Sequence, residues 1–164
     1  MDMGNPIARR SFIAAGAATT MAGGSPLVRS EPGAFTDGPG AAFPGTDPAL
    51  AREIVLVSHF SIDRVSELLE DDRSLALASW DWGFGDWESA LGAASHMGNR
   101  ETAEALIAHG ARPNLFTLAM MDMVDAVRAV CELRPGIQGA NGPHGITLLE
   151  HAQNGKADRV VEYL

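Results

Sequence analysis

Four stretches of the chain repeat one helical pattern. Each begins with an acidic residue, has an apolar residue two positions later, and continues with an apolar pair three and four positions after that. These spacings place the apolar side chains on one face of a helix, and a carboxylate in the first turn favours the positive end of the helix dipole. The acidic positions are Asp63, Glu101, Asp125 and Asp158, followed by Val65, Ala103, Val127 and Val160 and by the pairs Leu68/Leu69, Leu106/Ile107, Val130/Cys131 and Tyr163/Leu164. Four amphipathic helices of one pattern indicate a repeat architecture.

A second helix precedes each of these four, most clearly in the second unit. Residues 89–98 form one predicted helix and residues 99–109 the next, with Gly98 at the corner between them and Gly110 at the end. Glycine readily adopts the left-handed conformation that lets one helix stop and an antiparallel one begin. The sequence therefore predicts helix-turn-helix units.

The second unit resembles an ankyrin repeat. Matching positions are Ser89, Leu91, Ala94, Gly98, Gly110, Ala111 and Asn114, whereas Ala90, Gly92 and Arg112 depart from the family's Pro, His and Asp. The resemblance implies an all-α fold, an ankyrin-repeat solenoid of about four helix-turn-helix units, over residues 48–164. Asp47-Pro48 and the pair Thr147/Glu150 fit helix starts, the latter as a capping box.

The units are unequal in length. The predicted corners at Phe60, Gly98, Asp122 and Gly155 are 38, 24 and 33 residues apart, against about 33 in an ankyrin array. The long first gap contains all three tryptophans, Trp80, Trp82 and Trp87. Because Leu164 comes soon after the start of the last helix, we also expect the chain to be a fragment of a longer protein. The alternative is an exposed end that contacts a partner.

The first 47 residues lack the periodic apolar face. Arg9-Arg10-Ser11-Phe12-Ile13 and the mildly apolar run to Met21 resemble a twin-arginine export signal of bacteria. The resemblance implies a signal peptide at residues 1–22, a disordered linker at 23–47, a periplasmic or otherwise exported protein, and no stable membrane anchor after cleavage. The alternative is a disordered N-terminus in which the arginine pair arose by chance.

Composition argues against one class of function and against a disulfide. The net charge of −9 argues against nucleic-acid binding, which depends on lysine and arginine neutralising phosphates. Cys131 stands alone, so no intramolecular disulfide is expected, and its place on the apolar face predicts a buried, inert thiol.

The sequence predicts no catalytic residues, no metal site and no cofactor. The five histidines show neither His-Glu-x-x-His nor any other local metal spacing, and most are expected to bond backbone groups. A minority hypothesis remains open, in which His96, His144, Glu88 and Glu150 converge beside the tryptophans and form an acid/base site.

The resemblance implies a non-enzymatic scaffold that binds a protein partner. The predicted contact surface consists of Trp80, Asp81, Trp82, Asp86, Trp87, His96 and Met97, because tryptophan is enriched at binding hot spots. Packing of the tryptophans over the first repeat junction is the competing interpretation of this segment.

Two other functions compete with the scaffold. The first is a small-ligand or enzymatic pocket built from the Trp80–Trp87 loop and the His144 turn, which requires His144 to lie within roughly 10 Å of a tryptophan ring. The second is an accessory protein that stays bound to one co-exported enzyme.

Overall fold

A computed structural model describes residues 46–164, and this part of the chain is predominantly α-helical, as the sequence predicted. The predicted signal and all but the last two residues of the linker, at residues 1–45, lie outside the described residues. None of the helices in residues 46–164 has the length and apolar character needed to cross a membrane. The α-helices are α1 (Pro48–Val57), α2 (Ile62–Asp71), α3 (Ala90–His96), α4 (Arg100–Ala108), α5 (Leu115–Met120), α6 (Val124–Leu133), α7 (Leu148–Asn154) and α8 (Asp158–Tyr163).

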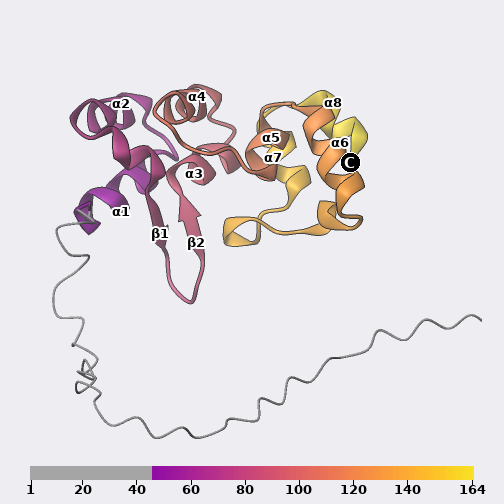
Figure 1. The fold of residues 1–164 in the computed structure, drawn as a ribbon, viewed down its shortest axis with the longest axis horizontal. Coiled ribbons are helices and arrows are strands. Elements are labelled where there is room, and N and C mark those ends of the chain that lie inside the picture. Colours follow the sequence, from indigo (N-terminus) through magenta and orange to yellow (C-terminus); the bar gives the residue numbers. More distant parts are fainter. Residues whose placement is uncertain (1–45) are drawn as a thin grey trace, which may run out of the picture. The chain divides into compact units, whose positions relative to one another are not determined.

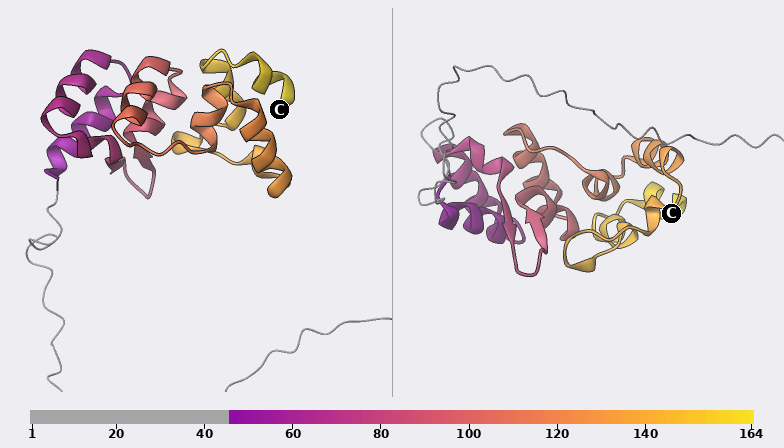
Figure 2. Two further views of the ribbon diagram at one scale, coloured as in Figure 1. Left: turned by 45° about the horizontal axis from the view of Figure 1, so that its top comes forward. Right: turned by 60° about the horizontal axis from the view of Figure 1, so that its bottom comes forward.

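The helices form four consecutive pairs. In Figure 1, α1 and α2 are followed by α3 and α4, then by α5 and α6, then by α7 and α8. The two helices of each pair contact each other, and the first helices contact in the order α1, α3, α5 and α7. Figure 2 shows the same succession from two further sides. The first helices therefore form the continuous layer of the described domain.

The helix starts follow from local sequence. The Asp47 carboxylate accepts a hydrogen bond from the backbone N–H of Ala49, and Thr147 and Glu150 form the predicted capping box. The first turns of α2, α4, α6 and α8 contain the predicted acidic residues Asp63, Glu101, Asp125 and Asp158. Capping groups satisfy N–H donors that have no partner within the helix, so these residues fix where the helices begin.

The corners are confirmed, with two differences in mechanism. At the first corner Phe60 does not have a positive φ, and the fourth corner differs as well. Gly98 and Asp122 adopt left-handed backbone conformations, with φ of 71° and 61°. At the fourth corner the left-handed residue is Lys156, whereas Gly155 has a φ of −75°. A Cβ on Gly155 would lie 2.2 Å from the carbonyl oxygen of Met120, so glycine is required there for close approach of α5 and not for its conformation.

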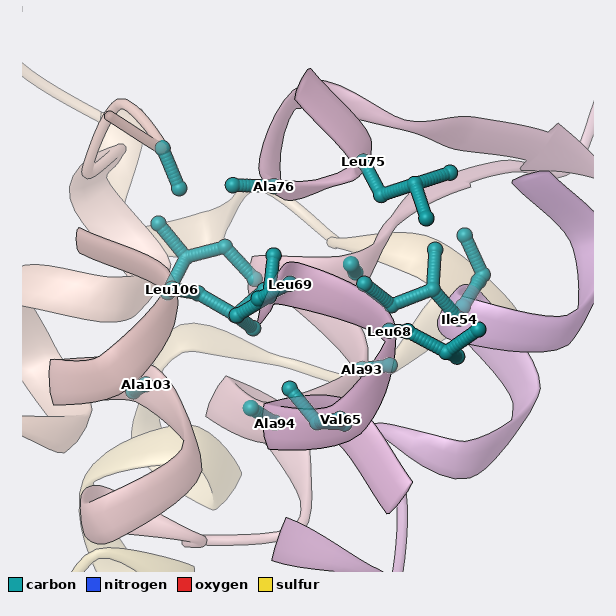
Figure 3. Close-up of a cluster of buried hydrophobic side chains, with 14 of the residues drawn as sticks. Ile54, Val65, Leu68, Leu69, Leu75, Ala76, Ala93, Ala94, Ala103 and Leu106 are labelled. Carbon is teal, nitrogen blue, oxygen red and sulfur yellow. The ribbon is translucent and has the colours of Figure 1, made fainter. Parts of the chain in front are cut away.

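An apolar cluster fills the space between the first two helix pairs. Figure 3 shows Ile54, Leu68 and Leu106 among its labelled side chains, and all three are at most 3% exposed. A second apolar cluster lies farther along the chain and includes Val127, Leu148 and Val160. Cys131 belongs to it and is buried, as predicted.

The long first gap contains a β-hairpin that the sequence did not predict. Strand β1 (Ser79–Asp81) pairs antiparallel with β2 (Trp87–Ser89), after a 3₁₀ turn, η1 (Arg73–Leu77). Two further 3₁₀ turns, η2 (Ile137–Gly139) and η3 (Pro143–Gly145), connect α6 to α7. The hairpin extends beyond the helices on the side where the connection from α6 to α7 runs (Figures 1 and 2).

Candidate metal centre

Four side chains from separate elements converge beside the hairpin. His59 lies in the turn after α1, Glu88 on β2, His96 at the end of α3 and His144 in η3. One nitrogen or oxygen from each lies within 4.8 Å of the corresponding atoms of the others. The converging atoms are imidazole nitrogens and a carboxylate, which are ligands of transition metals.

The distances between these atoms fit a single small ion. His59 Nε2 lies 3.1 Å from His96 Nε2 and 3.5 Å from Glu88 Oε2, and His144 Nε2 lies 3.3 Å from the same oxygen. Ligands of a tetrahedral ion with bonds of about 2.0–2.1 Å are separated by roughly 3.3 Å. These three spacings lie around this value, and the separations within the set of four reach no more than 4.8 Å, so a modest shift of the side chains would accommodate an ion.

Two of the histidines are oriented through their other ring nitrogen. His59 Nδ1 lies 3.1 Å and 3.0 Å from the carbonyl oxygens of Val55 and Leu56, and His144 Nδ1 lies 2.7 Å from Asp86 Oδ2. A carbonyl oxygen and an ionised carboxylate only accept hydrogen bonds, which assigns the proton to Nδ1 in both rings. In the neutral ring the lone pair is then on Nε2, the atom that faces the cluster. Such partners are typical of metal-binding histidines.

Glu88 is the buried centre of the cluster. Its side chain has no solvent exposure, and the indole N–H of Trp82 donates to Oε2 over 2.8 Å. Oε1 lies 2.9 Å from His96 Nε2, yet within residues 46–164 it receives no hydrogen bond of acceptable geometry. A buried carboxylate oxygen without a donor is costly, and a metal ion bound through Oε1 as well as Oε2 would satisfy it.

The charge state of Glu88 also suits a cation. Burial is the largest influence on the pKa of Glu88 and acts to raise it, but contacts with His96, Trp82 and His59 outweigh burial and lower the pKa overall. Glu88 is therefore a carboxylate at neutral pH. An anionic ligand inside an apolar domain favours binding of a divalent ion.

The η3 turn is held to the hairpin by Asp86. Asp86 Oδ1 accepts the backbone N–H of His144 over 3.0 Å, and the two residues are 58 positions apart in the sequence. His144 itself has a left-handed backbone, with a φ of 59°. The hydrogen bonds from the backbone N–H and the side chain of His144 lower the pKa of Asp86, and the backbone N–H has the larger effect. The pKa of His144 is raised, since Asp86 and Glu88 together outweigh its burial.

The backbone around the ligands is fixed by two asparagines. Asn99 Nδ2 donates to the carbonyl oxygen of His59, and Asn154 Nδ2 donates to that of His96, each over 2.6 Å. Asn99 follows the α3–α4 corner and Asn154 ends α7. The ligand positions are thereby connected to three of the four helix pairs.

The predicted contact residues divide into three groups. Trp80 and Trp82 pack against the first apolar cluster, and Asp81 accepts the N–H of Gly83 inside the hairpin loop. Trp87 and Met97 are exposed, at 63% and 49%. His96 is a ligand of the candidate centre and is only 5% exposed, and Asp86 bonds another ligand, His144. His96 is therefore not available as part of an open contact surface.

The minority hypothesis of a convergent cluster is right for three of its four residues. His96, His144 and Glu88 lie together, but Glu150 does not belong to the cluster because its carboxylate caps α7 at Thr147. His144 and Trp82 both contact Oε2 of Glu88, at 3.3 Å and 2.8 Å, so His144 meets the distance criterion for a pocket.

His59 was not predicted to belong to the cluster. His59 and His96 are 37 residues apart in the sequence. They come together only because α1 packs against α3, so no local spacing in the sequence predicts that they meet. The available signal was weak: His59 and His96 lie at the ends of successive first helices. The expectation of no metal ion stays a prediction, and the convergence of four donor side chains argues against it.

Comparison with known proteins gives no further guide to the site. No protein-family model matches the chain, and neither a curated protein nor a solved structure matches it.

Proposed function

We propose that this domain binds one divalent transition-metal ion through His59, Glu88, His96 and His144. The observation that carries the proposal is the convergence of four donor atoms within 4.8 Å, one of them from a fully buried carboxylate. Three imidazoles and one carboxylate suit zinc, nickel, cobalt, copper(II) or iron(II) better than calcium or magnesium, which prefer oxygen ligands. The proposal assigns binding and no reaction.

The ion would connect elements that otherwise share few contacts. Among the described side chains, only Asp86 forms hydrogen bonds between the hairpin and η3, and both of them go to His144. An ion bound by Glu88 and His144 adds a second connection, and His59 and His96 tie it to the helices. A ligand that binds only the folded state stabilises that state, so the ion acts as a structural clamp.

Calorimetric titration of the chelator-treated protein with Zn²⁺ tests the proposal. We expect saturation at one ion per chain and a rise in the melting temperature on loading. The variant His144→Ala removes one ligand whose side chain is 32% exposed. His109→Ala is the control, because His109 bonds only the carbonyl oxygen of Ala105 within the described residues and is not one of the converging donors. Equal Zn²⁺ affinity in the wild type and His144→Ala would contradict the proposal.

The ankyrin assignment and export are separate proposals. Support for ankyrin architecture comes from the stacked helix pairs and from the left-handed glycines at Gly98 and Gly110. The proposal of a periplasmic protein rests on the arginine pair and apolar run of the first 22 residues. Fractionation of cells producing the full chain, compared with an Arg9→Lys/Arg10→Lys variant, tests export.

Protein binding through the hairpin is the second candidate function. Phe84 is fully exposed at the hairpin tip, and Trp87 is 63% exposed. Large apolar side chains in such positions are typical of contact sites. Affinity capture from a periplasmic extract tests this function with Trp87→Ala, since Trp82 is engaged with Glu88. Equal recovery of a stoichiometric protein by Trp87→Ala and the wild type would argue against this surface.

A further inference from the structure

His151 is a fully buried histidine with an unused nitrogen next to the candidate centre. It lies on α7 with no solvent exposure, and its Nδ1 is 2.8 Å from the carbonyl oxygen of Thr147. That carbonyl only accepts, so Nδ1 carries the proton and Nε2 offers a lone pair. Within the described residues Nε2 has no hydrogen-bond partner. A buried acceptor of this kind calls for a donor.

The His151 ring lies close to the centre but outside its set of ligands. Its ring centroid is 6.2 Å from that of His96, while those of the ligand pair His59 and His144 are 6.4 Å apart. Since the set of four converging donors does not include His151, direct binding of the ion by this ring is not indicated. A water molecule bound to the ion could bridge the gap between the ion and His151 Nε2 and donate a hydrogen bond to that nitrogen.

A cavity of about 460 Å³ is lined by one ligand of the centre, Glu88, and by two neighbours of His151. Its walls include Glu88 and Asp86, the partner of His144, together with Phe116 and Gly142. The Phe116 ring is 4.8 Å from that of His151, and a Cβ added to Gly142 would lie 3.2 Å from His151 Cε1. The cavity therefore adjoins the ligands on one side and the neighbours of His151 on the other.

We propose that the metal ion keeps one exchangeable position, occupied by a water molecule that donates a hydrogen bond to His151 Nε2 and replaceable by a small anion entering through this cavity. This inference rests on the proposed metal binding. Four protein ligands and one water give five-coordination, which zinc-type sites can adopt. The chemical class of the exogenous ligand is a small monodentate anion.

Azide titration of the cobalt(II)-loaded protein tests the inference. Cobalt(II) takes the ligands that zinc takes, and its visible spectrum changes when a ligand is exchanged. We expect azide to change the spectrum saturably. In the wild type, azide must displace a water molecule that donates a hydrogen bond to His151. In His151→Phe this hydrogen bond is absent, so azide should bind about threefold to tenfold more tightly than in the wild type. A histidine that served only to fill space would give equal or weaker azide binding on replacement.

Controls separate this inference from the metal proposal. His109→Phe replaces the matched histidine away from the centre and should leave azide affinity unchanged. Gly142→Ala adds a methyl group beside His151 and should weaken azide binding about fivefold or more, which keeps the test intact if His151→Phe fails to fold. If cobalt(II) binds once per chain and azide changes nothing, the exchangeable position is refuted while metal binding stands. If azide binds equally to wild type and His151→Phe, the role of His151 is refuted.

Discussion

The apolar cluster around Leu106 and the polar cluster around Glu88 lie in one domain, and α3 contributes to both. Ala93 and Ala94 of this helix pack in the apolar cluster, while His96, at its end, belongs to the candidate centre. Apolar side chains gain stability in proportion to the area they remove from water and require no specific partner. The polar cluster instead holds a carboxylate that must be compensated by hydrogen bonds or a cation.

The apolar cluster stabilises the fold without a ligand, whereas the stability of the polar cluster depends on one. The side chain of Leu106 is completely buried among other apolar groups. Glu88 and His151 are buried equally well, yet each has an atom without a hydrogen-bond partner in the described part of the chain. We expect chelator treatment to weaken the region of the hairpin and η3 and to leave the first two helix pairs folded.

The largest effect is expected from Leu106→Ala. Removing a fully buried leucine side chain leaves a cavity and lowers the free energy of unfolding by about 2–5 kcal/mol. Because the loss is unrelated to the ion, denaturant titration should give the same difference from wild type with Zn²⁺ and with chelator. Leu133→Ala, at a position 86% exposed, is the control and should change little. A loss seen only with Zn²⁺ would contradict the division into two regions.

His144→Ala should show the reverse dependence. Loss of one ligand is expected to weaken Zn²⁺ binding by more than about 100-fold, while the metal-free protein changes by no more than about 1 kcal/mol, since the side chain is 32% exposed. Competition with a chelating dye gives the first value and denaturant titration the second. A large loss of stability without metal would show that the turn is held by its hydrogen bonds alone.

Asp86→Asn should have an intermediate effect on metal affinity. It removes the charge that orients and polarises His144 but keeps a similar shape, and such outer partners change metal affinity about 10–100-fold. The same dye competition measures it, and Asp81→Asn, on β1, is a control of the same type within the hairpin. An affinity equal to wild type would exclude Asp86 as a partner of the centre.

The smallest effect concerns the pH dependence of metal-free stability. Burial is the main cause that lowers the pKa of His151 in the folded protein. The unfolded ring takes up a proton below about pH 6.5, whereas the folded ring resists protonation, so wild type loses stability as the pH falls through this range. His151→Phe has no histidine to protonate at this position and does not lose this stability. As the pH falls from 7.5 to 5.5, its free energy of unfolding should therefore rise relative to that of the wild type by less than about 1.4 kcal/mol per pH unit. A difference that is constant over this range would contradict burial of an uncharged ring.

The helices were predictable because their signals are local. The acidic first turns, the caps at Asp47 and Thr147 and the corner at Gly98 are each specified within a few residues. The hairpin was not, since its strands are only three residues long and show no extended alternation of apolar and polar side chains. The centre was partly predictable: three residues of the convergent cluster were named, but His59 depends on the stacking of α1 on α3.

The positions of the four donors also bear on the kinetics of assembly. His59, Glu88, His96 and His144 belong to the first, second and fourth helix pairs and the segments next to them, so the ion closes a loop across most of the described chain. Bringing together residues so distant in sequence costs loop-closure entropy and slows folding. Metal uptake during refolding would then report completion of the whole domain. A single backbone cut between residues 97 and 143 would abolish metal uptake if the two fragments dissociate.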